Sequence, residues 1–181
     1  MDGNGNADCS LRACFYHAYQ FVFLILCDLV ENMEFEFKHF QELTTGELYD
    51  ILQLRSEIFV VEQNCVYNDL DGYDKDAIHM FLKIDGVMIA YSRLLKPGSR
   101  FSDFSIGRVV VKETERGTGM GIRMMEEAKR YIFEQWNAKK IKLSAQKYLR
   151  RFYEDLGFKV ITDEYLEDGI PHFGMLLEFQ A

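Results

Sequence analysis

The stretch Arg116-Gly117-Thr118-Gly119-Met120-Gly121 decides the fold, because it joins an apolar run at Ile106–Val111 to a long amphipathic segment. The apolar run is typical of a buried strand, and the amphipathic segment predicts a helix over about Gly119–Trp136. A glycine-rich turn between a strand and a helix brings the backbone close to a ligand, and the free N–H groups of the first helical turn point at an anion. The sequence therefore predicts a strand–turn–helix unit that holds phosphate groups.

The spacing within this turn excludes two common nucleotide-binding motifs. The dinucleotide fingerprint G-x-G-x-x-G requires glycine at position 122, where Ile122 stands, and no ribose-binding acidic residue follows in a strand. A P-loop requires Lys and then Ser or Thr after Gly121, and Ile122-Arg123 follows instead. The pattern that remains is Arg-x-x-Gly-x-Gly, which by itself also fits a plain tight turn between a strand and a helix.

Composition bounds the class of protein. A chain of 181 residues suits one compact domain with room for an appendage. The net charge of −8 argues against non-specific nucleic-acid binding and suits an amine-bearing substrate. Since the cysteines form no CxxC pair, we expect reduced thiols of a cytoplasmic protein and no metal site. The four cysteines are Cys9, Cys14, Cys27 and Cys65.

The N-terminal residues differ in composition from the rest of the chain. The apolar run Ala18–Cys27 is shorter than the roughly 20 residues that a membrane span requires, and its flanks are unlike those of a signal peptide. The alternating segment Met33–Phe40 then predicts a strand that opens the domain. We expect residues 1–32 to be an extension outside the core, as an upstream start codon would produce, and residues 33–181 to form the domain. The alternative is a helix that docks on the domain or on a second subunit.

The remaining elements follow from periodicity and turn signals. Thr44 and Glu47 predict a capping box at the start of a helix that runs to about Val61. Asp85-Gly86 between two apolar runs predicts a hairpin, and Gly157 is placed to end a helix. The expected later strands are His79–Ile84, Val87–Leu95, Phe104–Val111, Ile141–Ala145, Phe158–Ile161 and His172–Phe179, with a helix over Tyr148–Leu156. On the helix Gly119–Trp136 we expect the inner side to carry Ile122, Met125, Ile132, Phe133 and Trp136. This order predicts an α/β domain around a single sheet.

A second informative segment lies about thirty residues after the glycine turn. It contains Leu143-Ser144-Ala145-Gln146 and then Arg151-Phe152-Tyr153-Glu154-Asp155-Leu156-Gly157-Phe158. With the glycine turn before it, this order resembles the GNAT N-acetyltransferases over nearly all of Met33–Ala181, and it is most similar to the ElaA-like branch. The further residues that carry this resemblance are Leu54-Arg55, Ile58–Gln63, Asp69–Gly72, Gly107–Val111 and Tyr165–His172.

The resemblance implies the GNAT fold, with a mixed, mostly antiparallel central sheet flanked by helices, and acetyl-CoA as co-substrate. The pyrophosphate would lie on the backbone N–H groups of the glycine turn, and Arg116 would add a charge-assisted contact. The pantetheine arm would run along the strand before the turn, and Gln146 stands where many relatives carry an asparagine that reaches this arm. The residues expected to bind acetyl-CoA are Val109, Val110, Val111, Arg116, Gly117, Thr118, Gly119, Met120, Gly121 and Gln146.

The resemblance also implies direct transfer in a ternary complex, with Tyr153 as the general acid that protonates the departing thiolate. A phenol with a pKa of about 10 is protonated at neutral pH and is able to donate this proton. The candidate general bases are Glu62, His79 and His172, because each lies at the end of an element that faces the expected acceptor entrance. Structural readings stay open beside these: a core aromatic for Tyr153 and a hydrogen-bonded structural residue for either histidine.

The acidic segment after Glu62 carries Asp69, Asp71, Asp74 and Asp76. It does not fit a calcium loop, because the ligand spacing breaks at Tyr73-Asp74. It fits either a solvated loop that turns at Asp71-Gly72 or a rim that attracts a cationic amine.

We therefore expect an N-acetyltransferase for a small-molecule or peptide amine, cytoplasmic, without a membrane span, and the family makes a homodimer one expected assembly. The alternative is a non-catalytic acyl-CoA-binding or sensor module. The acceptor half, built from Val61–His79 and Tyr165–Phe173, specifies no particular amine.

Overall fold

The computed structural model describes residues 34–179. The expected extension over residues 1–32 and its apolar run lie outside these residues. The described residues from Phe35 onward belong to one unit. Within the described range, no helix is long and apolar enough to cross a membrane.

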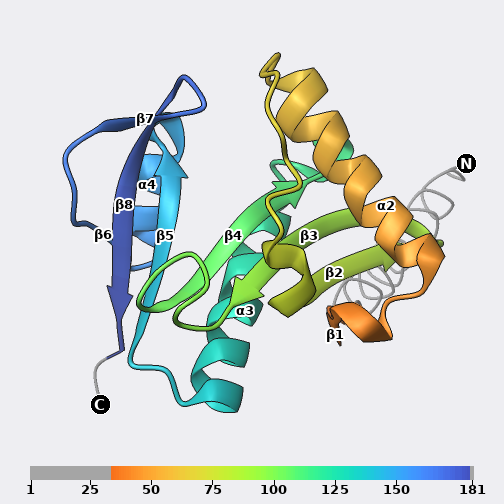
Figure 1. Cartoon of the computed structure of the whole chain (residues 1–181), viewed down its shortest axis with the longest axis horizontal. Coiled ribbons are helices and arrows are strands. Elements are labelled where there is room, and N and C mark those ends of the chain that lie inside the picture. The colour runs from red at the N-terminus through yellow and green to blue at the C-terminus, as the bar shows by residue number, and fades with distance from the viewer. Residues whose placement is uncertain (1–33, 180–181) are drawn as a thin grey trace, which may run out of the picture. The chain divides into compact units, whose positions relative to one another are not determined.

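Eight strands form one mixed sheet in the order β1-β2-β3-β4-β5-β8-β6, with β7 paired to β8 (Figure 1). Every neighbouring pair is antiparallel except β4 and β5, which run parallel. This confirms the expected mixed, mostly antiparallel sheet. The strands are β1 (Glu36–His39), β2 (Ile78–Ile84), β3 (Val87–Leu95), β4 (Phe104–Val111), β5 (Lys140–Gln146), β6 (Lys159–Val160), β7 (Tyr165–Glu167) and β8 (Ile170–Glu178).

Helices flank this sheet. In Figure 1, α2 crosses in front of the sheet, whereas α3 lies behind β4 in the parallel crossover from β4 to β5. The α-helices are α2 (Thr45–Arg55), α3 (Met120–Trp136) and α4 (Arg150–Asp155). The chain continues from α2 into a π-helical segment, η2 (Ser56–Glu62), and the short 3₁₀ segments are η1 (Phe40–Glu42), η3 (Tyr73–Asp76), η4 (Glu113–Glu115) and η5 (Lys147–Leu149).

The predicted local signals have their physical basis in the structure. The Thr44 hydroxyl accepts from the Glu47 N–H at 3.2 Å and the Glu47 carboxylate accepts from the Thr44 N–H at 2.9 Å, which confirms the capping box. Asp85 and Gly86 have φ angles of 49° and 79°, as a two-residue hairpin turn requires. The short strand β7 was not predicted, because three residues are too few to show an alternating pattern.

The buried face of α3 differs from the expected one. Its fully buried positions are Met124, Met125, Ala128 and Ile132, so the expected inward placement of Ile122 and Phe133 is wrong. Ile122 is 54% exposed because it faces a cavity described below, and the Phe133 ring packs near the Phe179 ring at the edge of the sheet.

The parallel pair β4–β5 is joined only at its beginning. Phe104 pairs with Ile141 and Ser105 with Lys142, and no further residues of the two strands are in register. Figure 1 shows the two strands close together at one end and diverging toward the other. The edge of β4 that faces β5 is therefore unpaired beyond Ser105 among the described strands, and space opens between the two halves of the sheet.

A bulge shapes β4 where this divergence develops. Tyr91 pairs with Val110 and Arg93 with Gly107, so two residues of β4 oppose one residue of β3. Arg108 in this bulge has a φ of 50°, a left-handed conformation that costs a non-glycine residue about 1 kcal/mol or more. Contacts of its side chain, described with the site, offset this strain.

Two arginines, Arg55 and Arg93, have no exposed surface, and both reach one carboxylate. The Asp74 Oδ1 atom accepts from Arg55 Nη1 at 2.8 Å and from Arg93 Nη1 at 2.9 Å. Because Arg55 ends α2 and Arg93 lies in β3, Asp74 ties the loop before β2 to both elements. An unpaired charge at this depth would cost several kcal/mol, so these partners depend on one another.

Asp74→Ala should lower the free energy of unfolding by about 3 kcal/mol, because it leaves two buried guanidinium groups short of a partner. Urea unfolding of the full chain measures this loss. The matched control is Asp76→Ala at an exposed position two residues away, which should change stability by less than about 0.5 kcal/mol. Equal effects of the two variants would contradict this account of the cluster.

Candidate active site

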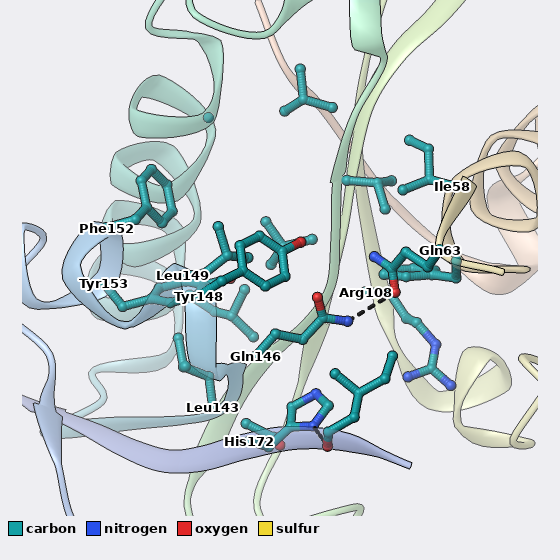
Figure 2. Close-up of a pocket in the computed structure, with 18 of the residues that line it drawn as sticks. Ile58, Gln63, Arg108, Leu143, Gln146, Tyr148, Leu149, Phe152, Tyr153 and His172 are labelled. Atoms are coloured by element: carbon teal, nitrogen blue, oxygen red, sulfur yellow. Dashed lines mark hydrogen bonds between the residues drawn. The ribbon is translucent and has the colours of Figure 1, made fainter. Parts of the chain in front are cut away.

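A cavity of about 600 Å³ occupies the space where β4 and β5 diverge. Figure 2 shows Leu149, Phe152 and Tyr153 on one side of it and Ile58, Gln63 and Arg108 on the other, with Gln146 and His172 between them. A volume of this size is usual for a small-molecule or cofactor site. The predicted site residues that line it are Glu62, Val109, Val110, Val111, Arg116, Gly117, Gly119, Gly121, Gln146, Tyr153 and His172.

The glycine turn forms the rim of the cavity at the start of α3. Gly117 and Gly119 have φ angles of 77° and 90°, which only glycine adopts readily, and Gly119 caps the helix. The 17-residue helix therefore presents its unpaired N–H groups and the positive end of its dipole at this rim. Thr118 and Met120 do not line the cavity: the Thr118 hydroxyl donates to the Glu115 carbonyl at 2.8 Å, and Met120 is buried in the core.

Arg116 lies beside this turn but is bonded to other protein groups. Its Nη1 and Nη2 atoms donate to the two oxygens of Glu62 at 2.6 and 2.8 Å, and its Nε atom donates to the Val111 carbonyl at 2.9 Å. The side chains of Arg116 and Glu62 are 40% and 41% exposed, so the pair lies at the mouth of the cavity. The hydrogen bond from Arg116 lowers the pKa of the Glu62 carboxyl, against a smaller opposing effect of burial, which makes Glu62 a weak base.

Gln146 reaches across the cavity. Its Nε2 atom donates to the Gln63 Oε1 atom at 2.9 Å, so an amide pair joins the end of β5 to the segment after η2 (Figure 2). Sequence reasoning assigned Gln146 to the donor arm and did not single out the side chain of Gln63.

Tyr153 lies on the α4 side of the cavity and is 5% exposed. The rings of Phe152 and Phe158 make T-shaped contacts with its ring, with centroids at 5.0 and 6.1 Å, and this packing restricts the ring plane. Burial raises the pKa of the Tyr153 phenol well above its usual value, with a further rise from Tyr148. The hydroxyl therefore stays protonated at neutral pH.

The two candidate histidines lie in different environments. His172 lines the cavity, and its Nδ1 atom lies 2.8 Å from the Ile170 carbonyl. If Nδ1 carries the proton for this bond, Nε2 of the neutral ring has a free lone pair. His79 has no exposed surface and lies 3.0 Å from the Tyr91 hydroxyl and 2.9 Å from the Asp74 carbonyl, away from the cavity. His79 is thus a core side chain, and its position removes it as a base candidate.

The comparisons with known proteins agree with this geometry. The sequence profile of the acetyltransferase (GNAT) domain matches residues 53–179. The chain belongs to the GNAT family. It is 40% identical over 148 residues to protein ElaA of Escherichia coli, covering 81% of this chain and 97% of that protein. A UPF0039 protein of Schizosaccharomyces pombe is 41% identical over 151 residues, covering 82% of this chain and 99% of that protein.

Solved structures of similar proteins have the same fold. An acyl-CoA N-acyltransferase from Pseudomonas aeruginosa aligns with a TM-score of 0.75 at 42% identity, covering 80% of this chain and 99% of that one. The crystal structure of E. coli ElaA aligns with a TM-score of 0.75 at 40% identity, covering 81% and 99%. The ElaA-like resemblance of the sequence is therefore confirmed.

A polar network that the sequence did not reveal lines the β8 side of this GNAT cavity. The Ser144 hydroxyl donates to the Glu167 carboxylate at 2.8 Å and lies 2.6 Å from the Tyr165 hydroxyl, and Arg100 donates to the other oxygen of Glu167. Burial would raise the pKa of Glu167, but Arg100 and then Ser144 lower it. Because Glu167 lies in the unpredicted strand β7, only the contacts of the folded chain bring these residues together.

The acidic loop is exposed over much of its length and turns at Asp71-Gly72 as expected, but three of its aspartates pair with arginines. Arg93 Nη2 lies 2.6 Å from Asp71 Oδ2, and Arg108 Nη2 donates to Asp71 Oδ2 at 3.1 Å and to the Asp69 carbonyl at 3.0 Å. Three arginines thus neutralise Asp69, Asp71 and Asp74 together, so these carboxylates do not form a free rim for a cationic amine. The loop and the bulge at Arg108 are consequently held to each other.

Across residues 34–179, no group of three or more His, Cys, Asp or Glu side chains gathers that could hold a metal ion. The GNAT cavity is lined by apolar side chains, backbone edges, amides and paired charged groups.

Stability should fall as the pH drops from about 5 to about 2. Burial would raise the pKa of the Asp71 carboxyl, but Arg93 and then Arg108 lower it to about 2, below the usual value of about 3.9 in unfolded chains. A carboxyl with a depressed pKa stabilises the fold above its unfolded pKa, and this contribution disappears as the pH falls through the folded pKa. Urea midpoints across this range measure the decline, and Asp71→Asn should flatten it. A variant with the same slope as the wild type would contradict this assignment.

Proposed function

We propose that this GNAT protein moves an acetyl group from acetyl-CoA to an amine, carried by a small molecule or a peptide, by direct transfer in a ternary complex. The observation that carries this proposal is the buried, protonated hydroxyl of Tyr153 on a cavity that also borders the glycine turn. Family membership and the similar acyl-CoA N-acyltransferase from P. aeruginosa support acyl-CoA as the donor.

The residues of the cavity fit the chemistry of acetyl-CoA. The N–H groups of the turn between Gly117 and Gly121 suit a pyrophosphate, since they lie at a helix N-terminus. The pantetheine arm contains peptide-like amides. Apart from the Val111 carbonyl, which accepts from Arg116, the edge of Val109–Val111 offers backbone groups that pair with such amides as a neighbouring strand would. Donor binding would therefore use the backbone more than particular side chains.

Tyr153 is proposed as the general acid. When the amine nitrogen attacks the thioester carbonyl, the C–N bond forms and the C–S bond breaks, so the leaving sulfur requires a proton. The phenol is protonated at neutral pH, and the packing of Phe152 and Phe158 holds it against the cavity. A positioned acid of this kind contributes about 10²–10⁴-fold in rate.

His172 is proposed as the base that accepts the proton released by the amine. The Ile170 carbonyl fixes the Nδ1 side of the ring, which directs the lone pair of Nε2 toward the substrate space. Figure 2 shows the ring pointing into the cavity beneath Gln146. Glu62 also lines the cavity but is neutralised by Arg116, so we assign it no role in proton transfer.

Tyr153→Phe should lower kcat by about 10²-fold or more and leave the Kd for CoA nearly unchanged, because it removes only the hydroxyl. Thiol release from acetyl-CoA across a panel of polyamines, amino acids and peptides measures the rate, and calorimetry measures Kd. Tyr49→Phe at an exposed position on α2 is the matched control and should retain full activity. CoA binding without turnover on any amine would favour the non-catalytic acyl-CoA sensor instead.

His172→Gln should lower the rate by about 10²-fold at neutral pH and less at higher pH, because a larger share of the amine is then already deprotonated. A pH–rate profile on the best acceptor measures this, with His39→Gln at an exposed position of β1 as the control. A loss that is the same at every pH would assign His172 a structural role.

A further inference from the structure

The segment Glu62–Cys65, here named the strap, connects η2 to three other parts of the cavity wall. Glu62 pairs with Arg116 beside the glycine turn, and Gln63 bonds to Gln146 at the end of β5. The Cys65 thiol lies 3.5 Å from the Asp168 carbonyl in the turn between β7 and β8. Asn64 has a φ of 48°, which turns the chain so that neighbouring strap residues face different elements.

Of the three contacts that the strap makes, the one between Glu62 and Arg116 is an ion pair. A bidentate arginine–carboxylate pair is among the strongest polar contacts that a protein makes, whereas the other two contacts are between neutral groups. Arg116 is fully engaged, because each of its three side-chain nitrogens donates to Glu62 or to the Val111 carbonyl. The position of the strap at the cavity mouth therefore depends on where Arg116 directs its guanidinium group.

The glycine turn that suits phosphate groups begins at the residue after Arg116. Arginine binds phosphate with the same two parallel N–H groups that it offers a carboxylate, so one face of Arg116 serves either partner. A phosphate on the turn would also lie close to the Glu62 carboxylate, and two negative charges at a short distance repel. Glu62 thus opposes phosphate binding both by holding Arg116 and by its own charge.

We propose that Glu62 and the phosphate groups of the donor compete for Arg116. Glu62 thereby determines how strongly the enzyme distinguishes donors with phosphate groups from donors without them. The same competition couples binding of the phosphate groups to release of the strap from Arg116. The inference rests on the proposed use of acetyl-CoA. By thermodynamic linkage the effect is reciprocal. The free energy by which the Glu62–Arg116 pair weakens CoA binding equals the free energy by which bound CoA weakens the pair. Phosphate binding then leaves Gln63 and Cys65 as the remaining attachments of the strap.

Calorimetric titration with CoA tests this competition. Glu62→Gln should tighten CoA binding by up to about fivefold, the upper end of the range expected for an exposed ion pair, and Arg116→Gln should weaken it. In the double variant the gain from Glu62→Gln should vanish, because there is no guanidinium group left to release. The matched control is Glu164→Gln, which removes a similarly exposed pair with Lys147 (2.7 Å) away from the cavity and should leave the Kd unchanged.

Pantetheine, which lacks the phosphate groups, distinguishes competition for Arg116 from a second mechanism, in which the Glu62 side chain merely blocks the cavity mouth. Its affinity should be equal for the wild type and Glu62→Gln. An equal gain for pantetheine and CoA, or weaker CoA binding by Glu62→Gln, overturns the competition while the acetyl-CoA proposal stands. Absence of CoA binding by the wild type overturns the proposed donor and this inference with it. Unchanged circular dichroism melting curves for all variants confirm that each one folds.

Discussion

The early end of pairing between β4 and β5 is the constraint on which the rest of this structure depends. Two register pairs join the strands, and beyond them the β4 edge is unpaired on the side that faces β5. A sheet edge inside a protein is costly unless something bonds to it, so the divergence creates a cavity whose β4 wall carries backbone hydrogen-bonding groups. The glycine turn, α4 and the strap are arranged around this opening.

The bulge at Arg108 and the acidic loop hold each other in place through the contacts of the Arg108 side chain. The strained backbone re-aims β4, and the Arg108 side chain holds Asp71 and the Asp69 carbonyl, which places the loop beside the cavity. Arg55 and Arg93 fix the same loop from α2 and β3. The loop is thus held by buried and partly buried ion pairs, which demand closer geometry than apolar packing does.

The sequence predicted those parts that local rules control. The capping box at Thr44, the hairpin at Asp85-Gly86 and the strand–turn–helix unit at the glycine turn each depend on neighbouring residues. What it did not reveal depends on contacts between distant segments. The partner of Arg116 lies 54 residues away, and that of Gln146 lies 83 residues away. Asp74 looks solvated in a polar loop, but it is buried where two arginines from other elements converge on it.

The short β4–β5 junction has a consequence for how GNAT proteins of this kind diversify. Since only two residue pairs of the parallel strands fix the two halves of the sheet, the separation of the halves further along is determined by side chains such as Gln63, Gln146, Arg100 and Glu167. Substitutions at those few positions could widen or narrow the substrate space without altering a single backbone hydrogen bond of the ladders. The fold can therefore stay constant while the shape of the cavity changes.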